Sequence, residues 1–181
     1  KHDYKNHLLN LKQLIAYQNT EASLQYIDQL INTNVTSKMN RFCNISYIDS
    51  YLNSIIESNN NINFDIHSTD LSQLSNMGFD ILIILMNLID NALENTSANT
   101  INVDIVYNHD IIIKVCNYSI KNPIKSHFKS SKGENHGLGL KIDNDIVMKY
   151  YGETYDNYEK TLYSKYIILK TGANTNEEIN I

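Results

Sequence analysis

The first part of the chain carries two stripes of apolar side chains at helical spacing. The first stripe consists of Tyr4, Leu8, Leu11 and Ile15, and the second of Leu24, Ile27 and Ile31. Because residues three and four apart lie on one face of a helix, each stripe predicts an amphipathic helix. The segment between them, "YQNTEAS", offers Thr20 as the N-cap of the second helix. The pattern therefore predicts an antiparallel helical hairpin over residues 1–38.

A hairpin of two short helices buries little apolar surface by itself. Two copies that pair into a four-helix bundle would bury both stripes, so we expect a homodimer. Packing of the hairpin against the rest of its own chain is the alternative. Residues 34–42, "NVTSKMNRF", interrupt the apolar pattern and are expected to form a linker.

A mixed pattern of helical and strand periods occupies residues 39–172. Residues 78–96 are mostly apolar and predict a buried helix, whereas "INVDIVY" at 101–107 alternates as a half-buried strand does. The other expected elements are a helix at about 45–58, a short strand in "NNNINFDIH", a strand at 111–117 after the turn "NHD", a helix at about 138–151 with Gly152 as its C-terminal cap, and strands in "TYDNYE" and "TLYSKYIILK". This order predicts an α+β chain in which the hairpin precedes a layered α/β sandwich with one sheet, and residues 173–181 form a frayed tail.

Composition narrows the possible classes of function. The net charge of −5 and the pI near 5.6 argue against a protein that holds nucleic acid through its phosphates. The longest apolar run, "ILIILMNLI" at 81–89, is about half the ~18–20 residues of a membrane-crossing helix. Cys43 and Cys116 show no metal or disulfide spacing, which fits a reducing, cytoplasmic setting. The abrupt start at "KHDYKNHL" leads us to expect a segment upstream.

Three of the six glycines lie close together in "SSKGENHGLGL", at Gly133, Gly137 and Gly139. The last two open a predicted helix, whose free N–H groups and partial positive charge can hold a phosphate. Glycine also lets backbone approach a ligand and adopt positive φ angles. The spacing matches neither the P-loop nor the dinucleotide fingerprint, so a flexible turn explains this stretch as well as phosphate binding does.

A second candidate feature is an asparagine stripe on the helix predicted at 78–96. Asn87, Asn91 and Asn95 follow at intervals of four residues, and Asp80 lies on the same stripe. Amide oxygens are hard ligands that suit Mg²⁺ bound to nucleotide phosphates. The alternative is a compositional bias toward asparagine, which would not by itself align these residues on one face.

With both segments in view, the chain resembles the sensor histidine kinases of the GHKL ATP-binding superfamily. "NLIDNALEN" at 87–95 looks like their N box, and "SSKGENHGLGL" looks like the ATP lid with the second glycine box. "HDYKNHL" looks like the His-Asp-aromatic start of the dimerisation helix in the quorum-sensing group that includes the accessory-gene-regulator receptor kinase. The resemblance implies a Bergerat-type ATP-binding sandwich at 39–172 that uses ATP and Mg²⁺, after a phosphotransfer hairpin at 1–38.

The resemblance also implies catalytic roles in the hairpin. His2 would accept the γ-phosphoryl group of ATP, and Asp3 would act as the neighbouring base or orienting carboxylate. Asn6, one turn later, would support dephosphorylation of the partner regulator, although an ordinary solvated helix position explains it equally well. His7 is the competing acceptor, but it flanks the apolar seam, whereas His2 falls outside the seam.

The remaining implied roles concern the nucleotide. Asn87 and Asn91 would hold Mg²⁺ and phosphates, with Asn95 beside them. The backbone around the glycines would bind the phosphates, and Lys132 would be a charge partner. The residues of this backbone segment are Gly133, Gly137, Leu138 and Gly139. Asn117 replaces an aspartate that usually reads the adenine amino group, and the first glycine box is missing, so we expect weaker nucleotide binding.

The expected activity is a protein-histidine kinase that autophosphorylates and then phosphorylates an aspartate in the receiver domain of a response regulator. The upstream segment would anchor the parent protein in the cell membrane and leave this region in the cytoplasm. Two other functions stay open, namely a phosphotransfer protein with a degenerate ATP domain and a non-enzymatic dimerisation scaffold. An ATP-hydrolysing relative is disfavoured, because Asn87 stands where such proteins carry a glutamate.

Overall fold

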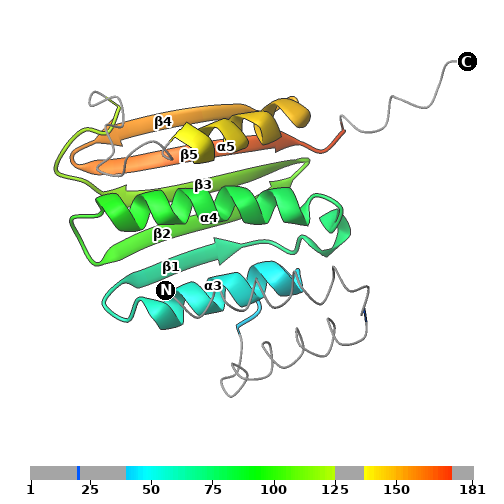
Figure 1. Ribbon diagram of the computed structural model, residues 1–181, viewed down its shortest axis with the longest axis horizontal. Coiled ribbons are helices and arrows are strands. Elements are labelled where there is room, and N and C mark those ends of the chain that lie inside the picture. Colours follow the sequence, from blue (N-terminus) through cyan, green and yellow to red (C-terminus); the bar gives the residue numbers. More distant parts are fainter. Residues whose placement is uncertain (1–19, 21–39, 125–136, 173–181) are drawn as a thin grey trace, which may run out of the picture. The chain divides into compact units, whose positions relative to one another are not determined.

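A computed structural model describes residues 20, 40–124 and 137–172 of the chain (Figure 1). The chain divides into two compact units, Lys1–Met39 and Asn40–Ile181. In the first unit only Thr20 is described, and it lies inside a helix rather than at the N-cap position predicted for it. The rest of the predicted hairpin and the tail 173–181 lie outside the described residues.

The second unit contains the helices and strands in the predicted order. They are α3 (Ser46–Ser58), β1 (Asn63–Ser68), the 3₁₀ helix η1 (Ser72–Leu74), α4 (Gly78–Asn95), β2 (Thr100–Asn108), β3 (Asp110–Tyr118), α5 (Gly137–Lys149), β4 (Glu153–Glu159) and β5 (Leu162–Lys170). The predicted mixed α/β sandwich is therefore confirmed for this unit. Apart from η1, which was not predicted, the hydrophobic periods identified each described element, because each period reflects which side chains reach the core.

The five strands form one sheet in the order β1-β2-β3-β5-β4. The pair β1–β2 is parallel and is connected through α4, while the other neighbouring pairs are antiparallel. The helices lie on one face of the sheet (Figure 1). On β2 the buried residues Ile101, Val103 and Ile105 alternate with partly exposed polar ones, as expected for a sheet covered on that face.

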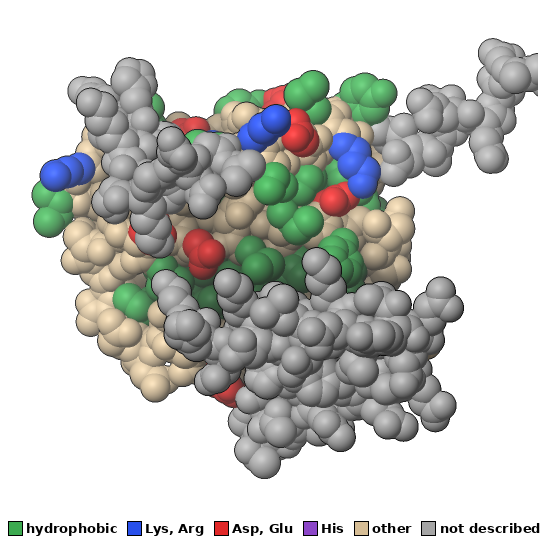
Figure 2. All heavy atoms as spheres, viewed as in Figure 1, with side chains coloured by type: hydrophobic (Ala, Val, Ile, Leu, Met, Phe, Trp, Pro, Cys, Tyr) green, Lys and Arg blue, Asp and Glu red, His purple; other side chains and the backbone are tan. Residues whose placement is uncertain are grey.

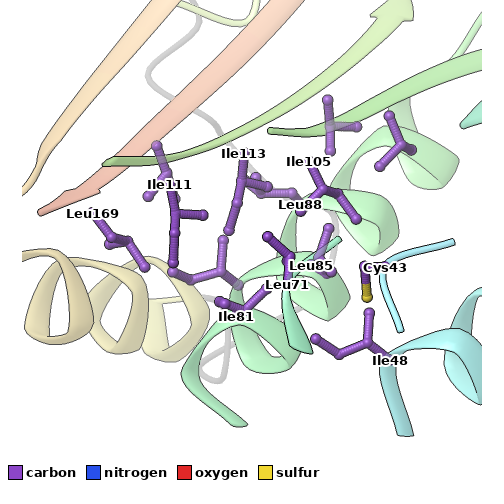
Figure 3. Close-up of a cluster of buried hydrophobic side chains, with 14 of the residues drawn as sticks. Cys43, Ile48, Leu71, Ile81, Leu85, Leu88, Ile105, Ile111, Ile113 and Leu169 are labelled. Carbon is purple, nitrogen blue, oxygen red and sulfur yellow. The ribbon is translucent and has the colours of Figure 1, made fainter. Parts of the chain in front are cut away.

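The core lies between this face of the sheet and the helices. Figure 3 shows Ile81, Leu85 and Leu88 of α4 directed toward Ile105 of β2 and Ile113 of β3. Complete burial of one such side chain contributes about 1.5–3 kcal/mol. The apolar sides of α4 therefore fix this helix on the sheet and leave its polar stripe for contacts along the helix layer.

The described part of the predicted linker, residues 40–42, is held on α3. The Asn40 N–H donates to Asn53 Oδ1 at 3.0 Å, and Asn53 Nδ2 donates to the Asn40 carbonyl at 2.8 Å. The backbone N–H groups of Phe42 and Cys43 both donate to Asp49 Oδ1, at 3.1 and 2.9 Å. Residues 40–42 contain no helix or strand, as expected of the linker, and two buried polar side chains of α3 act as their hydrogen-bond partners.

The C-terminal cap of α5 also differs from its prediction. Tyr151, not Gly152, adopts the left-handed conformation, with φ of 48°. The N–H groups of Tyr151 and Gly152 donate to the carbonyls of Met148 and Val147, at 3.1 and 2.8 Å, which is the Schellman arrangement. Glycine is required at 152 for another reason, since a Cβ there would lie 2.1 Å from the Ile168 carbonyl oxygen.

On the helix-bearing face, hydrophobic side chains are visible beside separate lysines and acidic residues (Figure 2). Among the strongly exposed apolar side chains are Phe79 of α4 and Met148 of α5, at 67% and 74%. Within the described residues, no helix combines the length and the apolar character that a membrane span requires.

Candidate functional site

Helices α4 and α5 run antiparallel and meet along the polar stripe of α4. At the start of α4, Asp80 Oδ2 accepts hydrogen bonds from Lys149 Nζ and Tyr150 Oη, both at 2.7 Å. Burial raises the pKa of Asp80, but the bonds from Lys149 and Tyr150 outweigh it and hold that pKa below its ordinary value. At this end of the helix pair, the charge of Asp80 has a cationic partner, Lys149.

At the other end of the pair, Asn87 contacts the first turns of α5. Its Nδ2 donates to Asp143 Oδ1 at 2.7 Å and to the Gly139 carbonyl at 3.3 Å. The structure thus brings together two features that are 52 residues apart in sequence, the asparagine stripe and the glycine-containing helix start. The amide of Asn87 turns its nitrogen toward α5, so its oxygen points away from Asp143.

The stripe continues beyond this contact with Asn91 and Asn95, which are exposed. Asn95 Nδ2 donates to the Asn91 carbonyl one turn earlier, at 2.8 Å. The asparagine face is therefore divided, because Asn87 is bonded to α5 whereas the last two asparagines face solvent in the described part of the chain.

Asp143 is a residue of this site that the sequence patterns did not single out. It is 4% exposed, and its Oδ2 is buried with no hydrogen-bond partner among the described residues. Burial raises the pKa of Asp143 to about 6, against the opposing effects of the Asn87 hydrogen bond and the Lys165 charge. A signal existed, since Asp143 occupies the first place of the buried stripe that continues with Ile146, Val147 and Tyr150.

A second polar group lies on the sheet, at the end of β3 and on the adjoining strands. Lys165 Nζ pairs with Asp156 Oδ2 at 2.9 Å, and Tyr163 Oη donates to the other oxygen of Asp156. Asn117 is 2% exposed and lies opposite Tyr163 in the β3–β5 register. Its Nδ2 donates weakly to the Tyr118 carbonyl at 3.4 Å. No hydrogen bond among the described residues joins Asn117 to Asn87.

The predicted glycine positions are only partly within the described residues. Gly137 begins α5, and Leu138 and Gly139 follow it. Gly139 does not have a positive φ, so glycine is not needed there for a left-handed conformation. A Cβ at 139 would lie 3.4 Å from Asn87 Oδ1, at ordinary contact distance. The glycine therefore keeps the space beside that oxygen open.

The other predicted site residues stay predictions without a structural description. Five of them lie outside the described residues, namely His2, Asp3 and Asn6 in the first unit and Lys132 and Gly133 ahead of α5 in the second.

The donor set at the α4–α5 junction suits a nucleotide with Mg²⁺. The amide oxygens of Asn87 and Asn91 are hard neutral ligands, and the start of a 13-residue helix supplies N–H groups and a partial positive charge. The buried, half-partnered carboxylate of Asp143 adds negative charge behind them, which favours a cation over a bare phosphate. The residues at this junction therefore fit a nucleotide together with Mg²⁺.

Residues 76–170, just over half of the chain, match the family model of the GHKL domain. The chain belongs to the GHKL domain family. GHKL ATPase domains bind ATP, usually with Mg²⁺. No curated protein matches this GHKL chain.

Solved structures confirm the fold at low sequence identity. The nucleotide-free catalytic domain of the histidine kinase ThkA has a TM-score of 0.52 at 21% identity, over 70% of this chain and 89% of that one. The mycobacterial sensor histidine kinase MprB gives 0.52 at 18%, over 67% and 90%. The histidine kinase domain of the Erythrobacter litoralis blue-light activated kinase EL346 gives 0.53 at 13%, over 83% and 71%. The described GHKL unit therefore has the fold of histidine kinase catalytic domains.

Proposed function

We propose that this chain is the catalytic region of a two-component sensor histidine kinase, which phosphorylates His2 from ATP and then an aspartate of a response regulator. One observation supports this above the others. Asn87 of α4 is bonded to Gly139 and Asp143 of α5, at 3.3 and 2.7 Å, so the amide stripe and the amino end of a helix form one site. Membership of the GHKL family supports a role of that combination in nucleotide binding.

Each group at this junction has a task that its chemistry allows. The first N–H groups of α5, which have no acceptor within the helix, can bind phosphate oxygens, and the oxygens of Asn87 and Asn91 can hold the cation. When bound, Mg²⁺ supplies positive charge that lowers the repulsion between the phosphates and an incoming nucleophile. Gly139 itself places no side chain beside Asn87 Oδ1.

Transfer to a side chain fits these residues better than hydrolysis does. Hydrolysis needs a group that takes a proton from the attacking water. Asn87, the first asparagine of the stripe on α4, has a neutral amide side chain that cannot do so. Asp143, the carboxylate that accepts a hydrogen bond from Asn87, is only 4% exposed, so it is poorly placed to take a proton from a water molecule of the solvent. An imidazole such as that of His2 needs only one unprotonated nitrogen to act as the acceptor.

The finer assignment is to the accessory-gene-regulator receptor type of quorum-sensing kinase. The motif "HDYKNHL", with His2 and Asp3, and the Ser-Ser-Lys-Gly run at 130–133 support it. The same assignment includes pairing of two hairpins over residues 1–38, a membrane anchor upstream and a receiver domain as the partner. Asn6 would then assist removal of phosphate from that receiver.

The test is incubation of the chain with γ-³²P-labelled ATP and Mg²⁺. Wild type and His7→Gln should acquire label that is lost in acid and stable in base, as phosphohistidine is, whereas His2→Gln should acquire none. Label that survives His2→Gln would contradict the assignment of the acceptor. A chain that takes phosphate only from a phosphorylated receiver would instead be a phosphotransfer protein, and a chain that does neither would be a scaffold.

A further inference from the structure

The contact between Asn87 and Asp143 has a consequence for the direction of the Asn87 amide. An amide side chain presents a donor at one end and an acceptor at the other, and rotation by half a turn exchanges them. Both groups that face Asn87 from α5, the Asp143 carboxylate and the Gly139 carbonyl, accept hydrogen bonds. The nitrogen must therefore face α5, since the reversed amide would place oxygen against oxygen.

Of these two acceptors, Asp143 is the stronger. Its distance to Asn87 Nδ2 is 2.7 Å and it carries charge, whereas the neutral Gly139 carbonyl lies at 3.3 Å. Lys165, the lysine whose charge acts on Asp143, is paired with Asp156 at 2.9 Å. Asp143 Oδ1 therefore accepts from Asn87, whereas Oδ2 has no hydrogen-bond partner among the described residues.

This arrangement is costly for a position that packing alone would fill with an apolar side chain. Asp143 continues the buried stripe of α5 toward its amino end, where Ile146, Val147 and Tyr150 contact the core. A buried carboxylate with one oxygen unbonded among the described residues lowers the stability of the folded state, so its presence indicates a requirement other than stability. The requirement that matches the geometry is the orientation of Asn87.

We infer that Asp143 is a positioning residue for the cation of this site: its carboxylate holds the Asn87 amide so that Oδ1 is turned away from Asp143 and serves as a ligand for Mg²⁺. The inference rests on the proposed function for the identity of the ligand. It predicts that loss of Asp143 lowers the Mg²⁺-dependent part of nucleotide affinity, because partners that orient a metal ligand typically change metal affinity by about 10- to 100-fold.

The first experiment measures the affinity of the 181-residue chain for the ATP analogue AMP-PNP by calorimetry, in EDTA and in MgCl₂. The ratio of the two affinities is the magnesium gain. In Asp143→Leu this gain should fall about 10- to 100-fold while affinity in EDTA does not fall and thermal stability does not decrease. Asp143→Asn, which keeps the shape but can present a donor to Asn87, should lose part of the gain.

Two further variants separate positioning from a general structural role. Asp80→Asn weakens the other end of the same helix pair, so it should lower stability and leave the magnesium gain unchanged. In the double variant Asn87→Ala/Asp143→Leu the gain should equal that of Asn87→Ala alone, because Asp143 acts through Asn87. A wild-type gain in Asp143→Leu, or a further loss in the double variant, would overturn the inference.

A second measurement needs no nucleotide and keeps the two proposals distinguishable. In the free protein, the side-chain NH₂ of Asn87 should exchange with solvent at least about tenfold faster in Asp143→Leu than in wild type, as followed by NMR. Equal exchange rates would contradict the lock itself. A locked amide in a wild-type chain that binds no AMP-PNP would contradict the proposed function and the cation role instead.

Discussion

Each end of the α4–α5 contact contains a carboxylate of one helix that accepts hydrogen bonds from outside that helix, and the two ends differ in how the charge of that carboxylate is compensated. At one end, Asp80 accepts from Lys149 and Tyr150, and its charge has a cationic partner at 2.7 Å. At the other, Asp143 is more deeply buried, accepts one bond from Asn87 and has an oxygen without a partner among the described residues. The first end contributes stability, whereas the second gives up stability to hold a polar group in one orientation.

The largest expected effect concerns a glycine at the stabilising end. Gly152→Ala places a Cβ 2.1 Å from the Ile168 carbonyl, so β5 or the end of α5 must move. We expect a loss of more than about 3 kcal/mol of unfolding free energy, measured by urea denaturation. A loss below about 1 kcal/mol would show that this junction is looser than the contact indicates.

The second prediction compares the pH dependence of the two carboxylates. The folded-state pKa of Asp143 is raised from 3.8 to about 6, so its contribution favours folding below pH 4 and is lost as the pH rises through about 6. That rise corresponds to about 3 kcal/mol. Denaturation at pH 4 and pH 7 should show that Asp143→Leu gains more stability relative to wild type at pH 7 than at pH 4.

Asp80 should give the opposite sign. Its pKa is lowered in the folded state, so its contribution is present above the unfolded pKa and is lost as the pH falls through the lowered value. We expect Asp80→Asn to lose about 1–2 kcal/mol at pH 7 and less at pH 3, by the same denaturation assay. If both aspartate variants shift with pH in the same direction, the comparison between the two ends is wrong.

The smallest effect on stability is expected at the other glycine of α5. Gly139→Ala places a Cβ 3.4 Å from Asn87 Oδ1 without a clash, and alanine favours a helix by about 0.5–1 kcal/mol over glycine. Stability should rise slightly while the affinity for AMP-PNP with Mg²⁺ falls, because the methyl group occupies space beside the ligand oxygen. Unchanged affinity would argue that the nucleotide does not approach from that side.

Much of the fold of the second unit was predictable, because the spacing of apolar residues identifies its helices and strands. The apolar sides of α4 and the alternation in β2 gave these elements and the mixed fold. The order β3-β5-β4 was not predictable, since strand order depends on pairing between distant segments. The roles of residues 40–42 and of Gly152 were missed for a related reason. Both depend on contacts with another segment, namely Asp49 and Asn53 in one case and the Ile168 carbonyl in the other.

The candidate site shows the same limit at the level of single residues. The spacing identified Asn87 and Gly139, which the structure places in contact. Asp143 was missed because an aspartate in a polar stretch of helix looks solvated until its register with Ile146 and Tyr150 is considered. The roles of Asn91, Asn95, Asn117 and His2 stay predictions.

The central claim is that the α4–α5 junction binds a magnesium nucleotide through Asn87. Calorimetric titration of wild type and Asn87→Ala with AMP-PNP in MgCl₂ tests it most directly, with urea denaturation as the check that both chains are folded. We predict measurable binding by wild type and affinity at least about 100-fold lower in a folded Asn87→Ala. A wild-type titration without heat at saturating nucleotide, or equal affinities of the two chains, would contradict the account.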